Sequence, residues 1–235
     1  MENESNRAWD FDMPVGSGFL SPREYVMSVE RGEIPDLPIA GSNKGSAGKP
    51  GFNFAAFAYS DRLFEVRDSL ITDFGLHIII DKVWISKLAE WIGDRTCLEI
   101  MAGAGWLAKG LSDAGVDITA TDDFSWEEDD YYRPCNVKAM RPFDVLRYDA
   151  VAACRGFSDR DILICSWPPK GSDLFHRACN EWGPGRTIVF IGEGLGGSTA
   201  DDNFFERFRE QDDPVEIPYH SWQGIRDRVR IGTYE

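Results

Sequence analysis

The sequence lacks the features of a membrane protein, an exported protein or a zinc protein. No apolar run among the 235 residues is long enough to span a bilayer. The N-terminus, MENESNRAWDFD, has neither the basic nor the apolar region of a signal peptide. The five cysteines form no Cys-x-x-Cys pair and have no histidines at zinc spacing. We therefore expect a cytoplasmic protein with no membrane contact, no metal, and buried, reduced, unreactive thiols.

Basic residues are also scarce, because 25 Lys and Arg face 40 Asp and Glu, for a formal net charge of −15. A protein that holds duplex nucleic acid by its phosphates needs a basic surface, so the charge argues against extended duplex DNA as a partner. The hydrophobic content of 43% is sufficient for one sizeable α/β core. We expect that core to carry an added segment rather than a second full domain.

Composition divides the chain into three parts. Residues 1–50 contain five prolines and the run Gly41–Gly48, which indicate a loop-rich arm with a flexible connector. Residues 51–93 form a helical cover segment, in which helical spacing of apolar residues predicts an amphipathic helix over Asp81–Ile92. From residue 94 to residue 235, apolar strands alternate with helices, which is typical of a nucleotide-binding α/β domain.

The most informative stretch is CLEIMAGAGWLAKGLSDAGVDITATDD, which begins at Cys97. A short apolar strand ends at Gly103-Ala104-Gly105, where missing side chains let the backbone turn sharply and approach a ligand. The residues from Trp106 to Ala114 suit a helix, and Gly115 is placed to end it. A helix that starts at the glycine turn directs its positive end toward a ligand in the turn.

A second strand, Ile118–Thr121, ends in Asp122 and Asp123. A carboxylate about 20 residues past the glycines is placed to accept hydrogen bonds from ribose hydroxyls. The alternative is an ordinary βαβ unit whose glycines only make a tight turn. The sequence around the glycines separates two families that use this unit, because dinucleotide dehydrogenases usually place the first glycine directly after the apolar run.

Here an acid, Glu99, lies inside the apolar run. Glu99-Ile100-Met101-Ala102-Gly103-Ala104-Gly105 resembles the acid-x-Gly-x-Gly-x-Gly first motif of class I S-adenosylmethionine-dependent methyltransferases. The resemblance implies that Glu99 organises the methionine end of the cofactor, that Ala102, Gly103 and Gly105 make room for it, and that Asp122 or Asp123 binds the ribose. Met101 departs from the motif, since it stands where the first glycine is expected.

Two further elements take roles from the same resemblance. Val145–Tyr148 is a third strand, and Asp149 at its end is expected to contact the adenine amine, with Asp144 as the reserve. The segment before the first motif tends to close over the cofactor in this family, which makes Phe57 and Tyr59 candidate lid residues.

A fourth strand, Asp161–Cys165, ends in Ser166-Trp167-Pro168-Pro169, and two prolines hold a rigid loop at the carboxyl end of the sheet, where open α/β sheets bind ligands. In amine-directed methyltransferases the similar loop has a polar residue, two prolines and then an aromatic residue, whereas here the aromatic residue precedes the prolines. The resemblance makes Ser166, Trp167 and Pro168 candidate residues for holding the acceptor. The other interpretation is a stiff strand terminator.

A fifth strand, Thr187–Ile191, runs into a glycine-rich segment that contains Glu193. Glycines at the carboxyl end of a strand indicate a tight turn or close approach of a ligand. Two roles are open for Glu193, which could act as a general base or orient a substrate amine, or could cap the neighbouring helix. His220 and Tyr219 are the other candidates for removing a proton from an amine or hydroxyl acceptor.

The last apolar segments, Val215–Ile217 and Arg228–Tyr234, are joined without a helix and predict an antiparallel hairpin, as in class I methyltransferases. The expected fold is α/β, with a Rossmann-like, mostly parallel sheet, helices on both faces and a C-terminal antiparallel hairpin, preceded by a loop-rich and helical N-terminal extension.

The resemblance implies direct transfer of a methyl group from S-adenosyl-L-methionine to a small molecule or a protein side chain. Two alternatives stay open, a base-amine methyltransferase acting on an exposed or flipped nucleotide and a catalytically silent cofactor-binding module. A nicotinamide oxidoreductase is a distant fourth.

Overall fold

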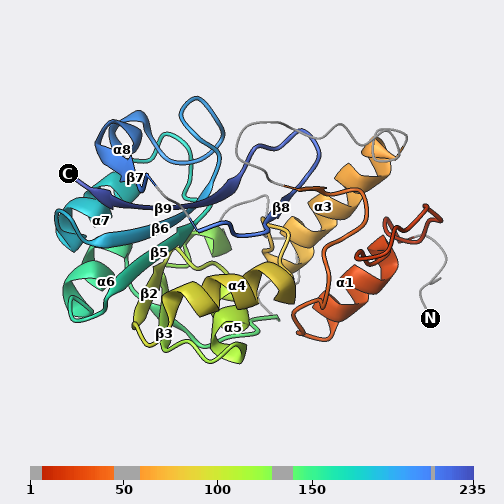
Figure 1. Cartoon of the computed structure of the whole chain (residues 1–235), viewed down its shortest axis with the longest axis horizontal. Coiled ribbons are helices and arrows are strands. Elements are labelled where there is room, and N and C mark those ends of the chain that lie inside the picture. The colour runs from red at the N-terminus through yellow and green to blue at the C-terminus, as the bar shows by residue number, and fades with distance from the viewer. Residues whose placement is uncertain (1–6, 45–58, 129–139, 213–214) are drawn as a thin grey trace.

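A seven-stranded sheet forms the centre of the computed structural model, which describes residues 7–44, 59–128, 140–212 and 215–235. The strands lie in the order β4-β3-β2-β5-β6-β9-β7 (Figure 1). They are β2 (Cys97–Ile100), β3 (Ile118–Asp122), β4 (Val145–Arg147), β5 (Ile162–Ser166), β6 (Thr187–Gly192), β7 (Phe208–Glu210) and β9 (Arg228–Tyr234).

Strands β2 to β6 pair in parallel, and β9 runs antiparallel to both β6 and β7. The mostly parallel sheet and its antiparallel C-terminal hairpin are thus confirmed. The predicted position of one hairpin strand is wrong, because Val215–Ile217 is irregular and Phe208–Glu210 pairs with β9 instead. The order reverses at β2, whose neighbours are β3 on one side and β5 on the other.

Helices cover both faces of the sheet (Figure 1). Alternate residues of the central strands point to opposite faces, so Ile162 and Ile164 belong to one apolar cluster with α4 and α5, whereas Leu163 and Cys165 belong to another with α6, α7 and α8. These helices are α4 (Lys82–Ile92), α5 (Trp106–Asp113), α6 (Ala150–Gly156), α7 (Leu174–Trp182) and α8 (Asp202–Arg207). None of the helices in the described ranges has the length and apolar character needed to cross a bilayer.

The described part of the N-terminal arm adds a helix that the sequence analysis did not predict, α1 (Pro22–Glu30). Its start follows from a capping box, in which the Ser21 side chain and the Glu24 carboxylate each accept a hydrogen bond from the other residue's backbone N–H. Tyr25, Val26 and Val29 are fully buried in the same apolar cluster as α4. The arm is therefore packed onto the sheet domain rather than separate from it.

Four further elements complete the described structure. Helix α3 (Ser60–Phe74) lies beside α1 at the end away from the C-terminus (Figure 1). Strand β1 (Asn43–Lys44) pairs antiparallel with β8 (His220–Ser221), which joins the arm to the C-terminal region. A short 3-10 helix, η2 (Ser125–Glu128), follows β3.

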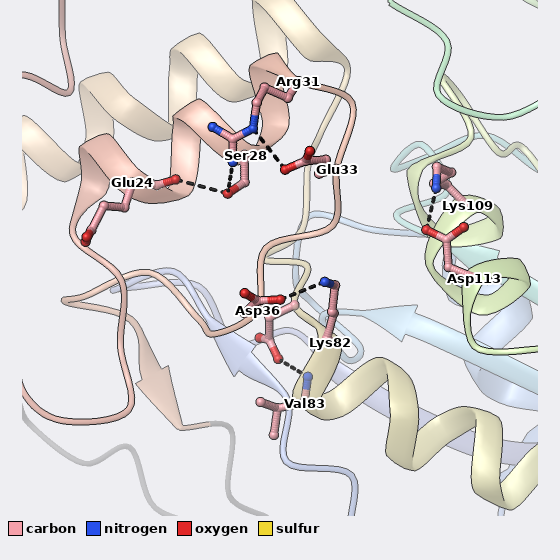
Figure 2. A network of polar contacts seen from close by, with 10 residues as sticks. Glu24, Ser28, Arg31, Glu33, Asp36, Lys82, Val83, Lys109 and Asp113 are labelled. Carbon is pink, nitrogen blue, oxygen red and sulfur yellow. Dashed lines mark hydrogen bonds and ion pairs between the residues drawn. The ribbon is translucent and has the colours of Figure 1, made fainter.

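Exposed ion pairs line the surface where the arm meets α4 (Figure 2). Lys82 Nζ lies 2.7 Å from Asp36 Oδ1, and Arg31 Nε lies 2.9 Å from Glu33 Oε2. Exposed pairs of this kind contribute about 0 to 1 kcal/mol each. The packing of the arm therefore depends on its buried apolar residues more than on these charges.

Candidate cofactor and acceptor site

A cavity of about 830 Å³ lies at the carboxyl ends of β2, β3, β4 and β5. This is the point where the strand order reverses, at which open α/β sheets bind their ligands. Its volume falls within the range typical of small-molecule sites, about 300 to 1,000 Å³. Eight of the residues predicted for the site line the cavity: Glu99, Ala102, Gly103, Asp122, Asp123, Ser166, Trp167 and Pro168.

The glycine turn between β2 and α5 forms the floor of the cavity. Gly103 and Gly105 have φ of +57° and +87°, a left-handed conformation that side chains rarely adopt. A Cβ atom on Gly103 would meet no atom of the described residues within 4 Å, so the backbone there borders open space. A Cβ atom on Gly105 would lie 2.7 Å from Val145 Cγ2. Gly103 thus leaves room for a ligand, whereas Gly105 permits close packing of β4.

Met101 keeps the bend that the motif assigns to glycine. Its φ is +54°, so the backbone takes the left-handed conformation despite the side chain. A non-glycine residue in this conformation costs about 1 to 3 kcal/mol. Its sulfur lies 4.0 Å from Cys165 Sγ, within the cluster of apolar residues next to β5. The departure from the motif therefore changes the side chain at the cavity wall and not the path of the chain.

This geometry predicts an inverted order of stability for two variants of Met101. Met101→Gly should unfold with a free energy about 1 kcal/mol higher than Met101→Ala, because both lose the side chain and only glycine is relieved of strain. In ordinary strand or helix interiors alanine is the more stable of the two. Urea denaturation of both variants measures the difference, and an alanine variant at least as stable as the glycine variant would contradict the strained backbone.

Glu99 is a buried carboxyl that borders the cavity from β2. The residue is 1% exposed, and its Oε2 atom has no hydrogen-bond partner in the described structure. Burial raises the pKa of Glu99 to about 8; the backbone N–H of Ala108 lowers it, and the charge of Asp122 raises it. A buried acid with one unpartnered oxygen is suited to a cationic ligand group in the cavity, which would favour its ionised form.

Asp122 and Asp123 at the end of β3 have different surroundings. Asp122 Oδ2 accepts the N–H of Gly103 at 2.8 Å, and its Oδ1 accepts the N–H of Phe124 at 2.7 Å and the indole N–H of Trp126 at 3.1 Å. Since a carboxylate has about four acceptor positions, Asp122 retains about one for a ligand. Asp123 Oδ1 accepts the N–H of Ser125 at 2.8 Å, which leaves more of its capacity available.

The end of β4 supplies the next wall. Tyr148 and Ala150 line the cavity, but Asp149 between them does not. Asp149 caps α6, since its Oδ1 accepts the N–H groups of Val151 and Ala152, each at 3.0 Å. The structure thus gives Asp149 a capping function, and its contact with adenine stays a prediction. Asp144, the reserve, does not line the cavity either.

The proline loop after β5 forms the opposite wall. Trp167 has φ of +53°, again left-handed for a residue with a side chain. The Trp167 N–H donates to the Ile191 carbonyl at 2.8 Å, and the Ala200 N–H donates to the Pro168 carbonyl at 2.9 Å. These bonds join the loop to β6 and to the segment before α8. The loop is therefore a fixed part of the cavity wall, as two prolines in sequence predict.

His77 is a cavity residue that the sequence analysis missed. Its ring stacks on Trp167, with centroids 6.1 Å apart and an interplanar angle of 27°. Burial, and then the charge of Arg67, lowers the pKa of His77 to about 4, so its imidazole is neutral at physiological pH. His77 comes from the link between α3 and α4, which contributes Gly75–Ile78 to the cavity. The sequence offers one signal for His77, which is that the chain contains only three histidines.

The predicted cover segment thus reaches the cavity through residues other than the two candidate lid residues. Phe57 lies outside the described residues. Tyr59 stacks on Phe11, with centroids 6.0 Å apart, and does not line the cavity.

The three predicted proton acceptors, Glu193, Tyr219 and His220, do not line the cavity. Glu193 accepts the N–H groups of Ser198 at 2.8 Å and Arg226 at 3.0 Å, one on each carboxylate oxygen. It therefore joins two loops, and the cap of α8 is Asp201 instead. We assign Glu193 this structural function and leave it out of the proposed chemistry.

The described cysteines are buried, and burial raises the pKa of Cys97 and Cys154 to about 12. Thiols with such pKa values are poor nucleophiles. Cys135 lies outside the described residues.

In sequence, the chain matches neither a protein-family model nor a curated protein. In structure, it is similar to TehB from Haemophilus influenzae, with 12% identity over 64% of this chain and 61% of that one, and a TM-score of 0.38. It is also similar to a SAM-dependent methyltransferase from Archaeoglobus fulgidus, with 14% identity over 63% and 92% and a TM-score of 0.38. An O-methyltransferase family protein from Burkholderia thailandensis gives 12% identity over 77% and 62% and a TM-score of 0.40. The match spans less than two thirds of TehB.

The strand order and the position of the first motif are independent of these likenesses. The sheet has five parallel strands, and its last strand, β9, runs antiparallel to them. The glycine turn, preceded by Glu99, lies at the point where the strand order reverses. The chain has a Rossmann-like α/β fold, with a mostly parallel sheet and an antiparallel strand at its C-terminus.

Proposed function

We propose that the protein is an S-adenosylmethionine-dependent methyltransferase. The observation that supports this most directly is the pairing of Glu99, a buried carboxyl with an orphaned oxygen, with the open backbone at Gly103. S-adenosylmethionine carries an ammonium group and a sulfonium centre, and the carboxyl of Glu99 suits these positive charges. The open space beside Gly103, where a Cβ atom would otherwise lie, leaves room for the cofactor. The residues that line the cavity therefore fit this cofactor.

Each part of the cofactor has residues suited to hold it. Glu99 and the turn from Ala102 to Gly103 suit the methionine end, and the carboxylates of Asp122 and Asp123 suit the ribose hydroxyls. Trp126 and Tyr148 offer aromatic surface for the adenine. When bound, the cofactor supplies a methyl group activated by the positive sulfur.

The acceptor would lie against the proline loop. Ser166 offers a hydroxyl, Trp167 and His77 offer stacked rings, and Pro168 fixes the path of the chain. The protein then contributes mainly by holding the acceptor in line, which accounts for up to roughly 7 to 11 kcal/mol of a barrier. The neutral His77 imidazole places an uncharged polar ring beside Trp167 on this wall. The lining of rings and uncharged polar groups favours a small molecule or a protein side chain.

A base amine of a nucleotide is the second candidate acceptor. It is favoured by one observation, the position of all four residues from Ser166 to Pro169 on the cavity wall. It is opposed by the carboxyl groups of Asp122, Asp123 and Glu128 on the same cavity, because they would repel the phosphates of a nucleic acid.

Isothermal titration with S-adenosylmethionine, S-adenosylhomocysteine and NAD tests the proposed cofactor. We expect micromolar binding of the first two and none of NAD. Binding of NAD alone would establish a nicotinamide site, and binding of none of the three would contradict the proposal. A radiolabelled methyl group then separates a transferase from a silent module, with amines, phenols, peptides and single-stranded oligonucleotides as acceptors.

A further inference from the structure

The indole of Trp167 needs an anchor, because its backbone is strained. A residue held at φ of +53° persists only where surrounding contacts fix it, at a cost of about 1 to 3 kcal/mol. Among the described residues, the stacked His77 and the guanidinium of Arg67 contact the ring, and the guanidinium carbon lies 5.7 Å from the ring centroid. Neither contact fixes the direction of the indole N–H, and a third contact does.

Asp227 provides that third contact. Its Oδ2 accepts the indole N–H of Trp167 at 3.1 Å and the phenol O–H of Tyr219 at 2.6 Å. Asp227 is 2% exposed and directly precedes β9, so the C-terminal hairpin holds its position. Its Oδ1 has no hydrogen-bond partner in the described structure. Burial of a carboxylate costs free energy, and among the described residues its two hydrogen-bond donors, one of them on the cavity wall, offset that cost.

The chain of contacts continues into the core. Tyr219 is 1% exposed, and its ring packs edge to face on Trp84 of α4, with centroids 5.3 Å apart. The indole of Trp167 is therefore linked through Asp227 and Tyr219 to a helix that covers the sheet. Each of these residues is buried or partly buried, and hydrogen bonds between buried groups are strengthened by the low local dielectric. We therefore expect a change in the hydrogen bonding of one residue to affect its neighbour.

We propose that Asp227 is a positioning residue for the acceptor, which holds the indole of Trp167 in place on the cavity wall through its Oδ2 atom. The inference rests on the proposed function, since it assigns that wall to the acceptor. Asp227 does not line the cavity, so it acts on the acceptor through Trp167. Tyr219 in turn acts through Asp227. The proposed cofactor end of the cavity is formed by the ends of other strands, β2, β3 and β4.

The charges around Asp227 make the link sensitive to pH. Burial raises the pKa of Asp227 to about 6, the hydrogen bonds from Tyr219 and Trp167 lower it, and the charge of Glu193 raises it further. The guanidinium of Arg67 faces the same indole from α3. Protonation of Asp227 near pH 6 weakens the acceptor atom that holds the indole, so the environment of the indole N–H should change over that range.

Nuclear magnetic resonance of the protein labelled with ¹⁵N-tryptophan tests the link without an acceptor. The Trp167 indole signal is identified by its loss in Trp167→Phe, and we expect it to shift with pH around a midpoint near 6. Asp227→Asn should keep a hydrogen bond and remove the pH dependence, whereas Asp227→Leu should move the signal toward that of a free indole. Tyr219→Phe should leave the bond and raise the midpoint, because Asp227 loses a donor that lowers its pKa.

Calorimetry with S-adenosylhomocysteine separates the two ideas. If the unaltered protein does not bind it, the proposed function fails, whatever the spectra show. If the protein and Asp227→Asn bind it with equal affinity and the Trp167 signal responds as described, the positioning function is supported. If the ligand binds but the Trp167 signal in Asp227→Asn keeps its position and its pH response, the inference is wrong. The other seven indole signals report whether each variant is folded.

Discussion

Glu99→Gln should weaken the binding of S-adenosylmethionine by about one to two orders of magnitude, as expected for loss of a charge-assisted contact of about 1.5 to 3 kcal/mol. The carboxyl is 1% exposed, and one of its oxygens has no partner in the described residues. Glutamine keeps the size of the side chain and removes the negative charge. The fold should be retained, because the neutral amide resembles the protonated acid that a pKa of about 8 implies at neutral pH.

The same variant should remove a pH dependence of binding. Below pH 8 the Glu99 carboxyl of the ligand-free protein is protonated, and a cationic ligand group lowers its pKa and expels that proton. The affinity should therefore rise with pH and level off above pH 8, with a slope of at most about tenfold per pH unit. In Glu99→Gln, any remaining dependence of the affinity on pH comes from the ligand's own ionisation. The difference between the affinity profiles of the unaltered protein and the variant is therefore due to Glu99.

Calorimetry at pH 6, 7 and 8.5, in buffers of different ionisation enthalpy, measures both affinity and proton release. Glu128→Gln is the matched control, because Glu128 also lines the cavity but is exposed. It should change the affinity less than Glu99→Gln and leave proton release as it was. Equal effects of the two variants would mean that only the overall negative charge of the cavity matters.

The sequence predicted the elements whose local signals agree with their tertiary surroundings. Strand β2, the glycine turn and α5 were located because an apolar run, paired glycines and a helical pattern follow one another directly. β9 was predicted with its observed bounds, Arg228–Tyr234. Its partner was not, since Val215–Ile217 has the stronger β-branched pattern. Pairing decides the outcome, and Arg209 in β7 lies opposite Thr233 in β9.

Residues of the site that tertiary contacts bring together were beyond a reading of the sequence. His77 and Trp167 are separated by 90 positions and stack only because the link between α3 and α4 passes the end of β5. Asp227 lies between two arginines in a strand-like segment, and such an acid is usually a surface residue. In the structure it is buried and accepts the Tyr219 hydroxyl, which no local pattern places beside it. Asp149 shows the converse, because the acid predicted to bind a ligand is the N-cap of α6 in the structure.

Three alanine substitutions should separate the glycine that makes room for the ligand from the one that permits packing. Gly103, Gly105 and Gly115 all have positive φ, of +57°, +87° and +91°. Alanine at Gly115, where nothing lies within 4 Å of the added Cβ, should cost about 1 kcal/mol of unfolding free energy from backbone strain alone. At Gly105 the Cβ would lie 2.7 Å from Val145 Cγ2 and 3.0 Å from Phe143 Cβ, so the cost should rise to about 2 to 4 kcal/mol.

Gly103→Ala should behave like Gly115→Ala in stability and unlike it in binding. The added methyl group meets no described atom within 4 Å, but Gly103 lines the cavity, so the methyl group occupies space that a bound cofactor needs. We expect the affinity for S-adenosylhomocysteine to fall by about a hundredfold, or about 2.7 kcal/mol, while Gly115→Ala keeps its full affinity. Urea denaturation and calorimetry on the three variants supply both quantities. Retained affinity in Gly103→Ala would place the ligand away from the glycine turn, because only a ligand in contact with that backbone is excluded by one methyl group.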